Sequence, residues 1–421
     1  MPPAWGRAPD ACSHSGAAKR VNYASNGELW VNGAMRVLLN GMAMLGRLTG
    51  VGQYAWRLAD ALHQLPAVEA VDVFEGRRIV PWLQFHSGAQ SRERVDRYER
   101  LKVWVREHAP FCRNLVSRCR AASFARHTRG PRWTVYHEPN YIPQRFAGAT
   151  VTTVCDMSYL RCPEYLPQDR LHWLRQRLET SVRHAQAVIA ISEFTRDELL
   201  DLFPGLDPAK LHVTPLGVDF DRFANTPDDE DVNIVRARHR LPSQFILYLG
   251  TLEPRKNLQG LVTAFSRLPL SLQREFPLVL AGMGGWKQHY FRPALDALRR
   301  RGLLHEIGYV ADAELPGLLR AAAVFCFPSI YEGFGLPPLE AAAAGTPVVA
   351  SRSSSLPEVL GNAAVYVDPL SADSIAGGLR KVLEQPSVQH ELRVAGRARA
   401  REYTWRRCAE RTVAAYERAA A

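Results

Sequence analysis

The chain lacks the cysteine patterns of a stapled or zinc-binding protein. Its seven cysteines form no C-x-x-C pair and leave one over. An odd number without that spacing argues against a disulfide framework and against a zinc knuckle. We therefore expect reduced thiols in a cytoplasmic protein.

Long apolar runs are also missing. No uncharged stretch approaches the roughly 18 apolar residues that cross a bilayer, so we expect a soluble or peripheral protein. The first 34 residues lack the continuous apolar core of a secretory signal. Because Met35-Arg-Val-Leu-Leu-Asn40 is typical of a first strand, residues 1–34 are expected to be a disordered extension, or Met35 is the true start.

Three further absences narrow the function. The dinucleotide fingerprint G-x-G-x-x-G with an acidic residue about 20 positions onward is missing, which weakens an oxidoreductase interpretation. The chain shows no solenoid-type repeat. No recognised nucleic-acid module accompanies its basic charge, so we expect no nucleic-acid partner.

The formal net charge of +11 comes largely from arginines, many of which cluster in residues 77–132. Interleaved with Trp104, Phe111 and Leu115, they resemble a basic amphipathic face that rests on anionic lipid. A solvated helical surface explains the same charge, and both interpretations stay open. Arginines of this segment include Arg92, Arg94, Arg97, Arg100, Arg106, Arg113, Arg118, Arg120, Arg126 and Arg129.

From Met35 onward, short apolar runs alternate with helical stretches, as a parallel sheet flanked by helices demands. The fold class is therefore α/β, and the length predicts two lobes. We place a first lobe at 35–222, a linker at 223–240, a second lobe at 241–400 and a final helix at 401–421.

Two glutamates stand eight positions apart in Tyr331-Glu-Gly-Phe-Gly-Leu-Pro-Pro-Leu-Glu340. Pro337 and Pro338 can open a helix, which would place Glu340 in its first turn. Gly333 and Gly335, with Phe334 and Leu336 beside them, would let backbone amides approach an anion at the helix start. A solvated loop glutamate plus a glutamate placed for the helix dipole is the competing explanation.

A second polar stretch follows the expected strand Phe245–Gly250. It reads Thr251-Leu-Glu-Pro-Arg255-Lys256-Asn257, and its adjacent arginine and lysine suit a diphosphate. An exposed basic turn is the alternative. Asp219-Phe-Asp221 has the spacing of a metal-binding Asp-x-Asp but falls in the expected hinge, so we predict no metal.

The first lobe offers weaker signals. His137-Glu-Pro-Asn140-Tyr141 and Cys155-Asp156 follow expected strands, where an acceptor would enter, and His137 and Asp156 are the candidates there. Holding the loops in place explains both residues equally well. Gly50-Val-Gly52 precedes a helix, where a glycine pair can also serve packing alone.

Together these motifs resemble retaining glycosyltransferases of family 4, which have the GT-B fold. The resemblance implies two Rossmann-like lobes facing a cleft, with a C-terminal helix crossing back to the first lobe, and no cofactor. It assigns Glu332 to the transferred sugar, Glu340 to the ribose, and Arg255 and Lys256 to the pyrophosphate. By the same resemblance, the Gly52 loop approaches the donor phosphates across the cleft.

The stretch Gly250-Thr-Leu-Glu-Pro-Arg-Lys-Asn257 is similar to bacterial mannosyl- and rhamnosyltransferases that build O-antigen chains. It implies metal-independent transfer of mannose or rhamnose from a nucleotide sugar, GDP favoured over UDP, to a glycan or lipid-linked acceptor. We expect a cytoplasmic enzyme, peripheral on the inner face of the plasma membrane. A nucleotide-sugar epimerase, a phosphorylase or a non-catalytic nucleotide-sugar-binding protein are the alternatives.

Overall fold

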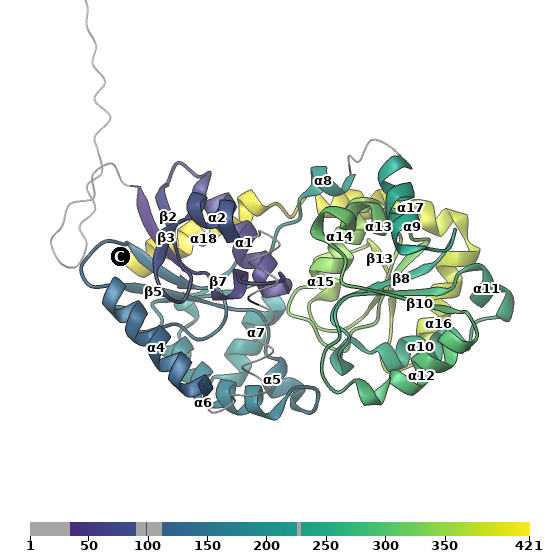
Figure 1. Cartoon of the computed structure of the whole chain (residues 1–421), viewed down its shortest axis with the longest axis horizontal. Coiled ribbons are helices and arrows are strands. Elements are labelled where there is room, and N and C mark those ends of the chain that lie inside the picture. Colours follow the sequence, from purple (N-terminus) through teal and green to yellow (C-terminus); the bar gives the residue numbers. More distant parts are fainter. Residues whose placement is uncertain (1–33, 90–97, 99–111, 225–228) are drawn as a thin grey trace, which may run out of the picture.

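The computed structural model describes residues 34–89, 98, 112–224 and 229–421. In this part the chain forms two α/β lobes, each built on its own sheet and lying side by side (Figure 1). Residues 1–33 of the predicted extension (1–34) and residues 225–228 of the predicted linker (223–240) lie outside it. The expected two-lobed α/β architecture is confirmed.

The first lobe contains a seven-stranded sheet in the order β3-β2-β1-β4-β5-β6-β7, parallel except for the β2–β3 pair. The strand order reverses between β1 and β4, which is where ligands gather in doubly wound sheets. The strands are β1 (Met35–Asn40), β2 (Val68–Phe74), β3 (Ile79–Pro81), β4 (Val135–Glu138), β5 (Ala149–Val154), β6 (Ala187–Ala190) and β7 (Leu211–Val213).

The second lobe contains a six-stranded parallel sheet in the order β10-β9-β8-β11-β12-β13. Its order reverses between β8 and β11, so it has the same kind of switch point. The strands are β8 (Ile246–Leu249), β9 (Leu278–Ala281), β10 (Leu304–Gly308), β11 (Val324–Phe327), β12 (Val348–Ser351) and β13 (Ala364–Val367).

Helices cover both sheets (Figure 1). Those of the first lobe are α1 (Gly50–His63), α2 (Trp82–Ala89), α4 (Cys112–His127), α5 (Ser158–Arg161), α6 (Gln168–His184) and α7 (Glu193–Leu202). The remainder are α8 (Phe220–Ala224), α9 (Asp229–His239), α10 (Leu258–Ser266), α11 (Leu270–Glu275), α12 (Arg292–Arg300), α13 (Leu315–Ala321), α14 (Leu336–Ala344), α15 (Leu356–Leu360), α16 (Ala372–Glu384), α17 (Pro386–Ala400) and α18 (Trp405–Ala420).

The strands are apolar on both faces because helices cover both. In β1, Val37 and Leu39 join a core shared with α1 and α18, whereas Leu38 packs on the other face against Phe124 of α4. The second sheet divides in the same way between two cores.

The C-terminal helix returns to the first lobe, where α18 lies against α1, β5 and β6 (Figure 1). The returning chain touches the outgoing connection, since the Val218 amide donates to the Tyr403 carbonyl at 3.0 Å. A Cβ on Gly217 would lie 2.2 Å from the Trp405 backbone nitrogen, so only glycine fits there. The predicted crossing helix is confirmed.

Candidate functional site

Two loops meet at the switch point of the second sheet. Strands β8 and β11 are neighbours, and Leu247 pairs with Phe325. Residues 251–257 follow β8 and residues 328–335 follow β11. Because parallel strands end at one edge of a sheet, the polar side chains of both loops gather there.

The basic pair lies in a 3-10 turn, η4 (Pro254–Lys256). Asn257 follows with a φ of +59°, a conformation that asparagine tolerates, and its side chain accepts the Gly260 amide at 3.1 Å to cap α10. Its Nδ2 also donates to the Pro328 carbonyl at 3.0 Å. The turn that carries the two cations is therefore fastened to the loop after β11.

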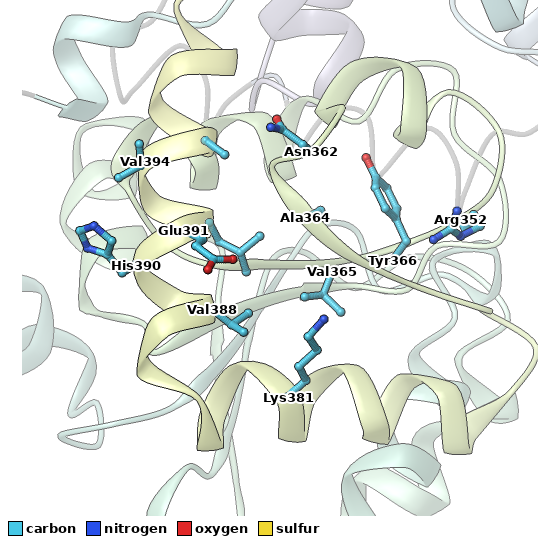
Figure 2. Close-up of a pocket in the computed structure, with 12 residues that line it drawn as sticks. Arg352, Asn362, Ala364, Val365, Tyr366, Lys381, Val388, His390, Glu391 and Val394 are labelled. Carbon is cyan, nitrogen blue, oxygen red and sulfur yellow. The ribbon is translucent and has the colours of Figure 1, made fainter.

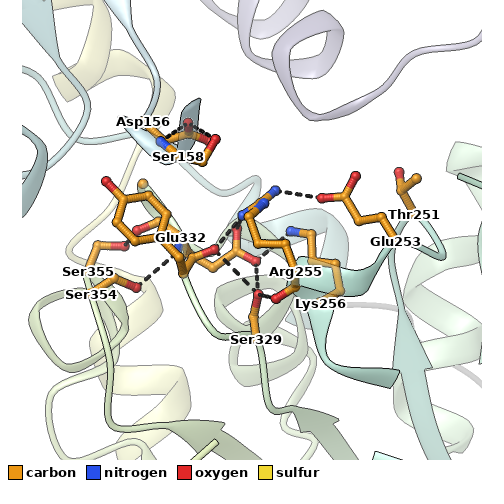
Figure 3. Close-up of polar contacts among 12 residues, drawn as sticks. Asp156, Ser158, Thr251, Glu253, Arg255, Lys256, Ser329, Glu332, Ser354 and Ser355 are labelled. Carbon is orange, nitrogen blue, oxygen red and sulfur yellow. Dashed lines mark hydrogen bonds and ion pairs between the residues drawn. The ribbon is translucent and has the colours of Figure 1, made fainter. Parts of the chain in front are cut away.

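Glu332 lies between both cations, with its side chain 9% exposed. Its Oε1 is 2.5 Å from Lys256 Nζ, and its Oε2 is 3.4 Å from Arg255 Nη1. The Ser329 hydroxyl also donates to Oε1. The structure thus brings together the three residues predicted to be catalytic (Figure 3).

The opposite charges in this cluster favour each other's ionised forms. Burial alone would raise the pKa of Glu332, but Lys256 and Arg255 hold it below its ordinary value. Burial would lower the pKa of Arg255, yet Glu332, Glu253 and Asp156 keep it above its ordinary value. Glu332 and Arg255 are therefore both charged in the ligand-free protein.

Glu253 completes the cluster, although the sequence pattern did not single it out. It is 3% exposed, and its Oε1 lies 2.8 Å from Arg255 Nη2 (Figure 3). The sequence signal that could have found it is the position of this carboxylate two residues before Arg255. The contact fixes the direction of the Arg255 guanidinium.

The backbone of Glu332 is held by the serine loop after β12. The Glu332 amide donates to Ser354 Oγ at 2.9 Å, and Ser355 Oγ donates to the Glu332 carbonyl at 2.9 Å. Both backbone polar groups of Glu332 are therefore satisfied next to its buried side chain (Figure 3).

Gly333 and Gly335 of this loop are each required for a different structural reason. A Cβ on Gly333 would lie 1.7 Å from the carbonyl oxygen of Cys155, which belongs to the first lobe. Gly335 has a φ of +95° and is the N-cap of α14, which begins at Leu336. Phe334 is 3% exposed and packs edge-on against Tyr403, with ring centroids 5.6 Å apart. The loop is shaped to fit against the first lobe.

Glu340 is not in the first turn of its helix, contrary to prediction. Because α14 begins at Leu336, before both prolines, Glu340 falls in the second turn. Burial and the negative charge of Asp312 raise the pKa of Glu340 to about 8, although Arg222 and Arg57 oppose the shift. Glu340 thus lies among charges from the first lobe, the connection and the second lobe.

Asp156 lies on the first-lobe side of the cluster (Figure 3). Its Oδ1 accepts the amide and hydroxyl of Ser158 at 3.0 and 2.7 Å, and the Tyr141 hydroxyl at 3.1 Å. Burial raises the pKa of Asp156, but Arg255 and the Ser158 hydrogen bonds bring it below its ordinary value. Asp156 both holds its loop and interacts electrostatically with the cluster.

His137 lies in the core of the first lobe, where it is fully buried. Its Nδ1 is 2.7 Å from Tyr416 Oη and its Nε2 is 2.8 Å from Thr153 Oγ1. Burial lowers the pKa of His137 to about 3, so the ring is neutral. Nδ1 joins α18 to the sheet and Nε2 joins β4 to β5, which fits the structural role of the two that the sequence left open. His137 and Asp156 are not brought together.

Gly52 packs the start of α1 closely against the preceding turn, because a Cβ there would lie 2.5 Å from the Ala43 carbonyl oxygen. Its neighbour Gln53 donates to Asp312 Oδ1 at 3.2 Å, and Arg57 Nη2 lies 3.4 Å from Asp312 Oδ2. The start of α1 therefore reaches the second lobe beside Glu340.

The two lobes also meet at a helix start. Ser192 caps α7, accepting the Thr195 amide at 3.0 Å. Glu358 of α15 accepts the Glu193 and Phe194 amides at 2.8 and 2.9 Å. A carboxylate here satisfies free amides and complements the helix dipole. Glu358 therefore fastens the second lobe to the first.

The Asp-x-Asp spacing at Asp219 and Asp221 lies in the connection between the lobes. Asp219 Oδ2 is 3.6 Å from Arg57 Nη1, so it takes part in the contacts around Asp312. Within the residues that the structure describes, no three His, Cys, Asp or Glu side chains gather as ligands for a metal ion.

The arginine-rich segment is described only in part, because residues 90–97 and 99–111 lie outside the described ranges. In α4, Phe124 is buried against the sheet, whereas Arg118 and Arg126 are exposed and Leu115 is 61% exposed. None of the helices in the described part has the length and apolar character needed to cross a membrane.

A cavity of about 800 Å³ lies on the second lobe between β13, α16 and α17 (Figure 2). None of the residues predicted for the site lines it. Its lining includes Arg352, Tyr366, Lys381 and Glu391, so it is separate from the cluster around Glu332.

Comparisons with known proteins agree with this architecture. The family described as glycosyl transferases group 1 matches residues 230–401, and the family described as Glycosyltransferase Family 4 matches residues 48–222. O-antigen chain mannosyltransferase B of Escherichia coli is 33% identical over 380 residues, covering 88% of this chain and 96% of that protein.

Solved structures show the same fold. Sucrose-phosphate synthase from Thermosynechococcus elongatus superposes with a TM-score of 0.69 at 20% identity, covering 91% of this chain and 98% of that one. Anabaena HepE in complex with UDP and glucose has a TM-score of 0.66 at 17% identity, covering 90% and 98%. The predicted GT-B architecture is confirmed.

Proposed function

The chain belongs to the family of group 1 glycosyl transferases, and we propose that it transfers a hexose from a nucleotide sugar to a growing O-antigen-type polysaccharide. The E. coli mannosyltransferase, similar over nearly its whole length, supports mannose as the sugar. The observation that carries the proposal is the pairing of buried Glu332 with Arg255 and Lys256 at the carboxyl ends of β8 and β11.

In this proposal each part of the donor contacts side chains of complementary charge or hydrogen-bonding character. Arg255 and Lys256 take the diphosphate, because a planar fork of donors and a compact ammonium together neutralise two phosphates. Glu332 then accepts hydroxyls of the sugar, and Glu340 accepts those of the ribose. Gly333 to Leu336 approach the donor at the start of α14.

Retention and metal independence are part of the same proposal. Arg255 and Lys256 supply positive charge where negative charge develops on the leaving diphosphate. Glu332 is paired with both cations, which suits binding rather than nucleophilic attack. The acceptor hydroxyl would attack the anomeric carbon from the face that the diphosphate leaves. The bond to the phosphate oxygen breaks, and that oxygen takes the proton.

We further propose a GDP-sugar donor and a lipid-linked acceptor reached from the inner face of a membrane. The E. coli mannosyltransferase relative supports a GDP-sugar donor, although the solved neighbour HepE was obtained with UDP and glucose. Exposed Arg118, Arg126 and Leu115 on α4 support contact with anionic lipid.

The test is incubation with radiolabelled GDP-mannose or UDP-glucose and a lipid-linked glycan acceptor, with and without a metal chelator. Incorporation from GDP-mannose in the presence of chelator, with retained anomeric configuration by NMR, supports the proposal. Isomerised or free sugar would point to an epimerase or phosphorylase, and binding without turnover to a sensor. Adding anionic or zwitterionic vesicles tests the membrane contact in the same assay.

Glu340 gives the proposal a pH signature. Because the pKa of Glu340 is raised to about 8, its carboxyl is largely protonated at pH 7 without ligand. Hydroxyls that donate to the ionised carboxylate favour loss of that proton, so GDP affinity should rise with pH between about 6 and 8. Calorimetry in buffers of different ionisation enthalpy should show proton release on binding at pH 7.

Glu340→Gln should remove both the proton release and this part of the pH dependence. Glu306→Gln is the control. Glu306 lies on β10, pairs with Arg292 of α12 at 2.8 Å and has no part in the proposed site. Proton release that is the same in Glu340→Gln and the unchanged protein would reject the ribose-binding role.

A further inference from the structure

Both sequence neighbours of Glu332 are fastened to the first lobe, although Glu332 belongs to the second. Tyr331 reaches Glu198 and Met157, and Gly333 reaches Ser192. These partners stand more than 130 positions away in the chain. The position of Glu332 therefore depends on how the two lobes lie against each other.

The Tyr331 hydroxyl makes two of these contacts. It donates to Glu198 Oε2 at 2.9 Å and accepts the Met157 amide at 3.1 Å. Glu198 is itself fixed by Arg161, whose Nε lies 2.9 Å from both carboxylate oxygens. The Tyr331 ring is 6% exposed and packs edge-on against Phe194 at 5.6 Å between centroids. The hydroxyl thus donates to a carboxylate of the other lobe that Arg161 holds in place and whose side chain is 12% exposed.

The backbone of Tyr331 contacts Arg255, one of the two cations of the site. The Tyr331 carbonyl accepts a hydrogen bond from Arg255 Nη1, the nitrogen that also faces Glu332. A shift of Tyr331 would therefore move both a partner of Arg255 and the backbone that carries Glu332.

On the other side of Glu332, the Gly333 carbonyl accepts Ser192 Oγ at 2.7 Å and Thr195 Oγ1 at 3.3 Å. Ser192 and Thr195 have no solvent exposure. Because water would satisfy these hydroxyls once the lobes part, each bond makes only a small net contribution to closure. Bonds of that size suit a contact that must form and break in every turnover.

We propose that Tyr331, Ser192 and Thr195 are positioning residues that couple closure of the lobes to the placement of Glu332 and Arg255. This inference rests on the proposed function. In the closed arrangement the three hydroxyls hold residues 331 and 333, so Glu332 is directed at the transferred sugar. When the lobes open, both anchors are lost while Arg255 and Lys256 still bind a diphosphate.

The first experiment replaces Tyr331 by phenylalanine, which keeps the ring contact with Phe194 and removes the hydroxyl. We expect kcat for transfer from GDP-mannose to fall about tenfold, while the Kd for GDP changes less than twofold. Small-angle scattering with GDP should show a larger radius of gyration than the unchanged protein gives. Tyr366→Phe is the matched control, because its hydroxyl donates to the Gly361 carbonyl at 2.6 Å beside the outer cavity (Figure 2).

The second experiment compares Thr195→Val, which keeps the shape, with Thr195→Ser, which keeps the hydroxyl. The valine variant should lower kcat severalfold, and the serine variant should stay within twofold of the unchanged protein. Equal losses in both, or a Tyr331→Phe kcat within twofold of normal, would overturn the coupling.

The scattering measurement separates this inference from the proposed function. If the unchanged protein transferred no sugar from any donor, the proposed function would fail. The radius of gyration with GDP would still report whether the three hydroxyls hold the lobes closed. An unchanged radius in Tyr331→Phe and Thr195→Val would reject the coupling by itself.

Discussion

Glu332→Gln is expected to lower sugar transfer by about a hundredfold to a thousandfold while leaving GDP bound as tightly as before, or several times more tightly. The loss follows because a group aimed at the reacting sugar contributes in the transition state, where removal of one such contact has effects of this size. The kept or improved binding follows from the ligand-free pairing, in which Lys256 Nζ lies 2.5 Å from Glu332. A diphosphate must compete with Glu332 for that ammonium.

Initial rates with GDP-mannose and calorimetry with GDP measure the two effects separately. Glutamine keeps the volume and can still accept from Ser329 and Lys256, so thermal unfolding should show a folded protein of lower stability. Glu306→Gln, which breaks a peripheral ion pair with Arg292, should change neither rate nor affinity. Near-normal transfer by Glu332→Gln would contradict the assigned role.

The sequence predicted most of the fold because its strands are strongly apolar. The expected strand at Met35–Asn40 matches β1, and the one at Phe245–Gly250 contains β8. Strands β2, β3 and β7 lack such a continuous apolar run. In β2 glutamate and aspartate interrupt the apolar residues, and β3 and β7 have three residues each, which is too few for a period.

Within the site, the sequence predicted the contacts made within one lobe and missed those made between the two lobes. Arg255, Lys256 and Glu332 could be brought together from the order of motifs, because each follows a strand of one sheet. Nothing in the local pattern of Tyr331 shows that its hydroxyl meets Glu198 of the other lobe. Such contacts are set by the relative placement of the lobes.

His137 and Glu340 show two other limits of pattern reading. His137 follows the expected strand pattern of a cleft residue, but α18 returns from the far end of the chain and covers it. Glu340 was placed one turn too early because two prolines tolerate several starting points, and α14 takes the earlier one at Leu336.

Neutralising both cations, by Arg255→Gln with Lys256→Met, is expected to weaken GDP binding at least a hundredfold. Each is a charge-assisted contact that contributes about 1.5–3 kcal/mol, and 1.4 kcal/mol corresponds to a tenfold change in affinity. Calorimetry with GDP measures the loss. Arg267→Gln removes one surface charge that pairs with Asp373 at 2.8 Å, so it controls for the loss of a positive charge outside the site and should bind normally.

The double variant has a second effect, because it leaves Glu332 buried without either counter-ion. Burial would then raise its pKa, and part of the lost affinity could come from rearrangement of the loop after β11. Adding Glu332→Gln removes the carboxylate together with its partners, so the triple variant isolates the contact with the diphosphate. Weak GDP binding in both variants would support the role of the cations. Recovery of normal affinity in the triple variant would show instead that Arg255 and Lys256 serve mainly to neutralise Glu332.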